Sequence, residues 1–209
     1  MKKHQIPLEE GRFYHVYNRG NNGDLLFYKP ENYRFFLRRL EEYLSPYVDI
    51  FAFCLLPNHF HLLVQVRERE EALHPGKEGE KALHFKNAKL LSGGASKAFH
   101  RLFTSYSKAI NKQEGRHGSL FENPFKRKEI TTTQYLVNVV CYIHANPQLH
   151  GIAPNFRDYP WSSYNRILTG KPSKLQKEQV LEWFSNAANY IACHSKVIEP
   201  DDLKDIIIE

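Results

Sequence analysis

Residues 48–66 read VDIFAFCLLPNHFHLLVQV, two apolar runs rich in β-branched and aromatic residues around a Pro-Asn pair at 57–58. Runs of this kind on either side of a short turn predict a β-hairpin, with strands at 48–56 and 59–66. We expect this hairpin at the centre of the fold, with the elements predicted from the neighbouring segments around it.

Four further elements form the expected core around this hairpin. They are a strand at 13–18, an amphipathic helix of about four turns from Pro30, a helix at 95–113 and a strand near the end of 119–130. The resulting order, βαββαβ, predicts an α+β, ferredoxin-like antiparallel sheet with helices on one face. A third helix is expected at 131–146, where Pro147 ends it.

The chain has 209 residues, enough for one sizeable core. We expect a main domain over 1–170 with an insertion at about 67–95, and a C-terminal helical extension over 171–209 that carries a helix at 176–193. The three cysteines form no C-x-x-C pair, so neither disulfides nor a cysteine zinc site is expected. With no signal segment and no apolar run of membrane-spanning length, a cytoplasmic protein without membrane contact is expected.

The most informative residues of the hairpin are His59 and His61. Alternate residues of a strand point to the same face, so the two imidazoles should project together and could chelate a divalent metal. Two histidines making ordinary hydrogen bonds on a half-exposed strand fit the same spacing. A metal site therefore needs a third ligand.

A second pair of residues that could take part in catalysis or metal binding lies in the helix expected at 131–146. Tyr142 and Asn146 are four residues apart and should share one helix face. A phenol can attack a phosphodiester as a covalent nucleophile, and an amide oxygen is an acceptable ligand for Mg²⁺ or Mn²⁺. A packing tyrosine and a helix-terminal asparagine explain the same residues, so the pair alone does not identify a nuclease. The other histidines considered are expected to be structural or on the surface: His15, His100, His117, His144 and His150.

The basic charge is concentrated in one part of the chain. Residues 97–128 hold eight Lys or Arg against two Glu, while the whole chain has a net charge of +6. Aromatic residues alternate with these cations, a composition typical of single-strand binding, although a solvated face with aromatics in the core is also compatible. Lys126, Arg127 and Lys128 are the residues expected to contact a nucleic-acid backbone.

Five segments, in order, resemble the HUH single-tyrosine transposases (insertion-sequence-200-like), and in particular the REP-associated tyrosine transposase branch. They are HVYNRG at 15–20, FCLLPNHFHLLV at 53–64, SLFENPFKRKEI at 119–130, YIHANP at 142–147 and YPWSSY at 159–164. The segment at about 67–95 matches the family pattern poorly, and the helix at 176–193 lies outside the diagnostic motifs.

The resemblance implies the ferredoxin-like fold, with His59 and His61 as the histidine pair, Asn146 as third metal ligand and Tyr142 as nucleophile. It also implies DNA transposition through cleavage and rejoining of hairpin-bearing single strands, with a 5′-phosphotyrosine intermediate and often a homodimer. Two other functions fit the sequence. One is a non-catalytic DNA-binding protein derived from such a transposase, and the other is a metal-dependent phosphoesterase that uses water.

Overall fold

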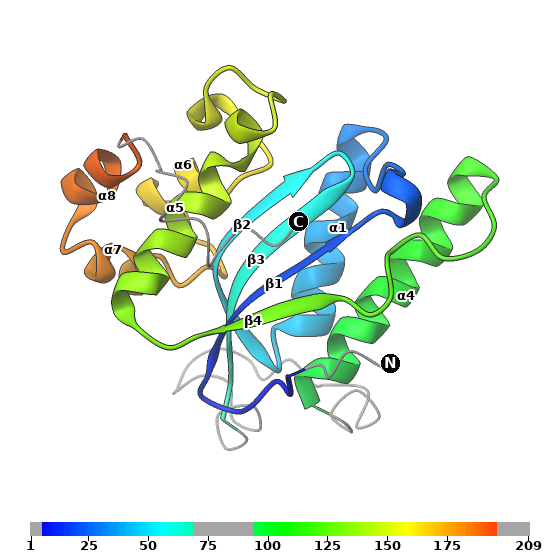
Figure 1. Ribbon diagram of the computed structural model, residues 1–209, viewed down its shortest axis with the longest axis horizontal. Helices are drawn as coiled ribbons and strands as arrows, with labels where there is room; N and C mark the ends of the chain where they lie inside the picture. The colour runs from blue at the N-terminus through cyan, green and yellow to red at the C-terminus, as the bar shows by residue number, and fades with distance from the viewer. Residues whose placement is uncertain (1–5, 69–93, 196–209) are drawn as a thin grey trace.

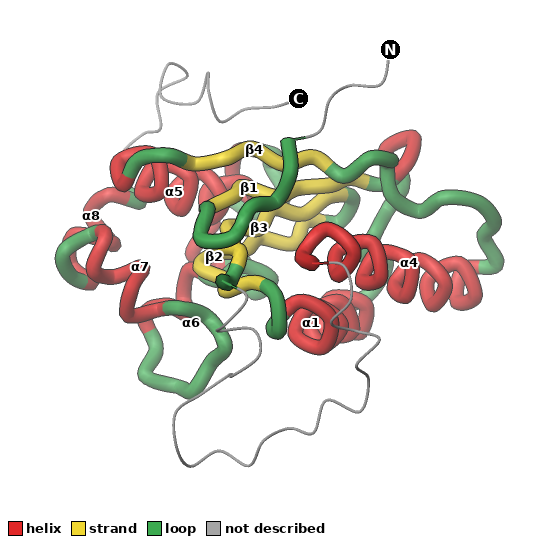
Figure 2. The backbone as a smooth tube through the Cα atoms, turned by 90° about the horizontal axis from the view of Figure 1, so that it is seen from below, coloured by secondary structure: helices red, strands yellow, loops and turns green. Residues whose placement is uncertain are grey.

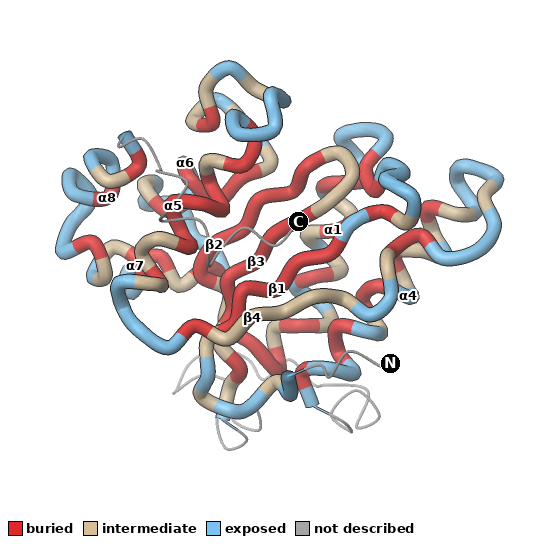
Figure 3. Tube along the Cα trace, viewed as in Figure 1, coloured by how far each residue is buried: buried red, intermediate tan, exposed pale blue. Residues whose placement is uncertain are grey.

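The computed structural model of the chain describes residues 6–68 and 94–195. Four strands form one antiparallel sheet in the order β2-β3-β1-β4. The strands are β1 (Phe13–Arg19), β2 (Val48–Leu56), β3 (His59–Val66) and β4 (Lys126–Ile130). The inner strands are mostly buried, whereas β4 is a half-buried edge strand (Figure 3). Most of the insertion expected at about 67–95 lies outside the described residues.

Two helices connect the strands and complete the expected chain order. They are α1 (Pro30–Leu44), between β1 and β2, and α4 (Gly94–Glu114), which precedes β4. The ferredoxin-like α+β fold is therefore confirmed (Figure 1). Among the described residues, no helix combines the length and the apolar character needed to cross a membrane.

The helices α1 and α4 lie side by side and cover one face of the sheet (Figures 1 and 2). Apolar residues recur three and four positions apart along both helices, so each turns an apolar stripe inward. Phe60 of β3 is fully buried against them, with its ring centroid 5.2 Å from that of Phe36 and 5.7 Å from that of Phe103. Burial of such side chains stabilises the fold by roughly 1.5–3 kcal/mol each.

The opposite side of the sheet carries the later helices, which form a second core with β2 (Figure 2). These helices are α5 (Thr133–Leu149), α6 (Tyr164–Leu168), α7 (Lys177–Trp183) and α8 (Ala187–Cys193), with a 3-10 turn η2 (Phe156–Asp158) after α5. The helices predicted on one face of the sheet are thus α1 and α4, while α5 to α8 cover the other face. Cys54 and Cys141 are buried, and no disulfide links the three cysteines, all of which lie within the described residues.

Two predicted helix boundaries are wrong. Helix α5 continues through Pro147 to Leu149, because the amide of His150 still donates to the carbonyl of Asn146 at 2.9 Å. A proline removes only its own N–H, which can be tolerated in a last turn. The C-terminal helix expected at 176–193 is two helices, since Ser185 adopts a left-handed conformation (φ 68°) and the Asn186 side chain caps α8.

Candidate active site

The sheet face beneath α5 changes from apolar to polar along its strands. At one end, Leu63 and Ile130 are buried in the second core. At the other end, Tyr17 lies between His61 on β3 and Lys126 on β4 in the pairing register. A cavity of about 440 Å³ opens at this polar end. Its lining includes Tyr17, Arg19, Asn58, His59, His61, Glu122, Lys126, Tyr142 and His150.

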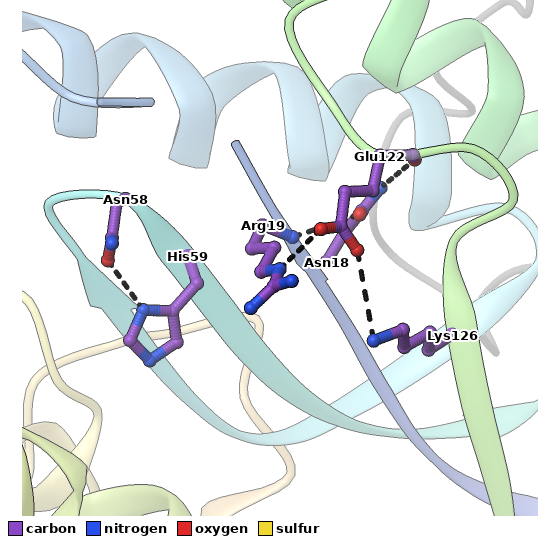
Figure 4. A network of polar contacts seen from close by, with 6 residues as sticks. All are labelled: Asn18, Arg19, Asn58, His59, Glu122 and Lys126. Atoms are coloured by element: carbon purple, nitrogen blue, oxygen red, sulfur yellow. Dashed lines mark hydrogen bonds and ion pairs between the residues drawn. The ribbon is translucent and has the colours of Figure 1, made fainter. Parts of the chain in front are cut away.

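The two histidines of the hairpin lie together in this cavity. The centroids of the His59 and His61 rings are 5.2 Å apart, and the rings are nearly perpendicular. His59 Nδ1 lies 2.7 Å from Asn58 Oδ1 (Figure 4). Because an amide oxygen only accepts hydrogen bonds, His59 Nδ1 is the donor and its Nε2 keeps a lone pair.

Helix α5 brings Tyr142 against the same strands. The ring centroid of Tyr142 is 5.5 Å from that of His61 and 5.9 Å from that of His15, in edge-to-face geometry. The helix starts at a cap in which the side chain of Thr132 accepts from the amide of Tyr135. The phenol of Tyr142 therefore lines the same cavity as the imidazoles of His59 and His61, which are far from it in the sequence.

Asn146 lies one turn beyond Tyr142 and is fully buried. Its Nδ2 donates to the backbone carbonyl of Tyr142 at 2.7 Å, which leaves Oδ1 as the free end of the amide. Asn146 Oδ1 and His61 Nε2 are both buried, and neither has a hydrogen-bond partner within residues 6–68 and 94–195. Unpaired buried polar atoms cost stability, so Asn146 Oδ1, and His61 Nε2 in the tautomer that leaves it a lone pair, fit ligands of a cation. However, Asn146 does not line the cavity itself.

Burial keeps the imidazoles of His59 and His61 neutral near pH 7, because it lowers the pKa of both. Burial, followed by the nearby His150 and Arg19, lowers the pKa of His59 to about 4. The pKa of His61 lies well below its ordinary value, because the ring is buried and surrounded by other imidazoles. Neutral imidazoles are the form that binds metals. In residues 6–68 and 94–195, no three His, Cys, Asp or Glu side chains form a metal-binding group.

Three residues of the site were not recognised from the sequence. His15 and His150 were expected to be structural or on the surface, and His150 is indeed exposed, but the sequence did not show that it also lines the cavity with its ring 4.8 Å from that of His59. His15 is buried beside His61, with Nε2 3.0 Å from His61 Nδ1. Tyr17 adds a second phenol to the cavity, and burial raises its pKa to about 12. By contrast, His144 is buried and bonded to His194 and Ser163 away from the cavity, so its structural role is confirmed.

The three cations proposed for backbone contact do not share one face. Lys126 lines the cavity, with Nζ 3.8 Å from Glu122 Oε2, and Glu122 also pairs with Arg19 (Figure 4). Lys128 lies on the same face, over the ring of Tyr135 at 5.5 Å. Arg127 points to the α4 side, over the ring of Phe125 at 4.6 Å. Strand alternation thus separates Arg127 from its two neighbours.

A ferredoxin-like sheet with a histidine pair beside a helix-borne tyrosine is the arrangement expected of an HUH single-tyrosine transposase. No protein-family model matches the chain. A Haemophilus influenzae protein named "Putative REP-associated tyrosine transposase" is 25% identical over 146 residues, which is 61% of this chain and 74% of the relative. A solved REP-associated tyrosine transposase bound to a REP hairpin has the same fold, with TM-score 0.57 and 16% identity over 80% of this chain and 86% of that one. The resemblance indicated by the motifs is therefore confirmed.

Proposed function

We propose that the protein is a metal-dependent transposase that cleaves and rejoins single-stranded DNA through a 5′-phosphotyrosine intermediate. The observation that carries this proposal is the Tyr142 ring lying 5.5 Å from the His61 ring at one cavity. The names of the similar proteins support the same activity, and the REP hairpin of the solved relative supports hairpin-bearing single strands as substrates.

His59, His61 and Asn146 would hold a divalent cation, Mg²⁺ or Mn²⁺. When bound, such an ion polarises the scissile phosphate and stabilises the charge that develops on it. Tyr142 Oη then attacks phosphorus and loses its proton, while the bond from phosphorus to the 3′ oxygen breaks. The leaving 3′ oxygen takes up a proton, and attack by a 3′-hydroxyl on the phosphotyrosine reverses the step. The phosphotyrosine conserves the bond energy, so ATP is not needed.

Lys126 and Lys128 are the cations best oriented to contact the backbone of a bound strand, since both lie on the cavity face of the sheet. Arg127 points to the α4 side of the sheet and would contact a bound strand only there. Assembly as a homodimer is part of the proposal, and light scattering on the purified chain tests it.

The test is incubation of labelled hairpin-bearing single strands with the protein and Mn²⁺, followed by denaturing electrophoresis. The wild-type protein should give a covalent protein–DNA band, and Tyr142→Phe should give none while still binding DNA. Tyr17→Phe is the matched control, because it removes the other phenol of the same cavity and should leave the band.

Other results identify the alternatives. A covalent band from Tyr142→Phe would show that Tyr142 is not the nucleophile. Binding without any cleavage would identify a non-catalytic DNA-binding protein, and cleavage without a covalent species would identify a phosphoesterase that uses water.

A further inference from the structure

His15 lies outside the histidine pair yet is in direct contact with it. It is 1% exposed on β1, and its Nε2 lies 3.0 Å from His61 Nδ1. The two rings are stacked with centroids 5.2 Å apart. One of these two nitrogens must carry the proton that they share, because a hydrogen bond needs one donor and one acceptor.

The position of that proton decides what His61 can do in the cavity. If His61 Nδ1 donates to His15, then His61 Nε2 carries a lone pair. If His15 donates instead, His61 Nε2 carries a hydrogen and cannot bind a cation. Among the described residues, neither His61 Nε2 nor His15 Nδ1 has a hydrogen-bond partner, so either arrangement leaves one unpaired N–H and one unpaired lone pair in this buried histidine pair.

The neighbouring histidine is held in the arrangement that metal binding requires. His59 Nδ1 donates to Asn58 Oδ1 at 2.7 Å, which leaves Nε2 as the lone-pair nitrogen. Metal-binding histidines commonly donate their second ring N–H to a fixed acceptor, which sets both tautomer and ring orientation. His59 has such an acceptor in Asn58. Of the two ring nitrogens of His61, Nδ1 faces His15, while Nε2 has no partner in the part of the chain that the structure describes.

We propose that His15 is a positioning residue that accepts the Nδ1–H of His61 and so holds the His61 Nε2 lone pair ready for a divalent cation. This inference rests on the metal site of the proposed function. A neutral imidazole takes the place usually held by a carboxylate or a carbonyl, so it orients His61 without adding negative charge. The packing of Tyr142 against both rings, at 5.9 Å and 5.5 Å, restricts their rotation.

The test is direct Mn²⁺ affinity at pH 7.5, measured by calorimetry on the full chain without DNA. His15→Phe fills the space but cannot accept a hydrogen bond, and it should weaken Mn²⁺ binding roughly 10–100-fold. His15→Gln offers an acceptor near the position of Nε2 and should restore most of the affinity. The matched control is His144→Phe, which replaces another wholly buried, hydrogen-bonded imidazole outside the cavity and should leave the affinity unchanged.

Unchanged affinity in His15→Phe, or equal weakening in His15→Gln, would overturn the role of His15 while leaving the metal site intact. A wild-type protein that binds no Mn²⁺ would instead overturn the metal site and this inference with it. Long-range ¹H–¹⁵N spectra of the Mg²⁺-loaded wild type decide the matter if a variant does not fold. A proton on His15 Nδ1 and none on Nε2 supports the proposal, and a proton on Nε2 overturns it.

Discussion

Lowering the pH from 7.5 to 5.0 should destabilise this protein strongly, because it buries neutral histidines. Burial and the Lys128 ammonium lower the pKa of His15 to about 3, and burial lowers that of His194 to about 4. Between these values and the ordinary 6.5, the unfolded chain binds more protons than the folded chain. The stability that these two histidines contribute is therefore fully present above pH 6.5 and is lost as the pH falls toward 4.

The expected size of the loss follows from His15 and His194, the two groups just described. At pH 5.0, each of His15 and His194 is protonated only in the unfolded chain, about 1.5 pH units below its ordinary pKa. That difference corresponds to roughly 2 kcal/mol per group, or about 4 kcal/mol for both. The pKa values of His61 and His144 are lowered in the same direction. Such a loss is large against a typical total stability of roughly 5–15 kcal/mol.

Urea unfolding of the metal-free protein at several pH values measures this loss, with tryptophan fluorescence as the signal. His194→Gln should reduce the pH dependence by about one proton, because it removes one buried neutral imidazole. A free energy of unfolding at pH 5.0 within about 1 kcal/mol of that at pH 7.5 would refute the reasoning.

Three further outcomes are expected. Lys126→Ala should weaken the binding of single-stranded DNA and lower the salt dependence of binding by about one charge, whereas Arg127→Ala should have a smaller effect. Fluorescence anisotropy measures both, and equal effects would contradict the placement of Lys126 and Arg127 on opposite faces of β4. Asn146→Ala should reduce Mn²⁺ affinity in calorimetry, and unchanged affinity would remove Asn146 from the ligand set. Phe60→Ala should cost roughly 3–5 kcal/mol in urea unfolding, because its buried ring contacts Phe36 and Phe103; a loss below about 1 kcal/mol would contradict tight packing there.

Local patterns in the sequence were sufficient for the fold and for part of the site. Strand alternation put His59 and His61 on one face, and helical spacing put Tyr142 and Asn146 on one side of a helix. Their meeting in space was an expectation from resemblance, because it depends on which sheet face the helix α5 covers. The ring contact between Tyr142 and His61 is a tertiary fact that spacing does not contain.

There are specific physical reasons why the sequence did not reveal the positions of His15 and His150 beside the histidine pair. His15 reaches His61 because β1 pairs with β3, and a register between distant strands is not encoded in either strand alone. His150 reaches His59 because α5 continues past Pro147, where proline preference predicted an end. The orientation of Arg127 could have been predicted, since alternation along β4 requires it to oppose Lys126 and Lys128.

The division of one sheet face into an apolar and a polar half explains how the site can exist at all. Buried atoms such as His61 Nε2 and Asn146 Oδ1 without partners cost about 1–3 kcal/mol each. The same helix that carries Asn146 buries Val139 and Ile143 in the second core, at roughly 1.5–3 kcal/mol for each such side chain. Apolar packing along α5 therefore offsets the unsatisfied polar atoms of the neighbouring site. The site is held in place by residues that take no part in its chemistry, which leaves its own polar groups available for a ligand.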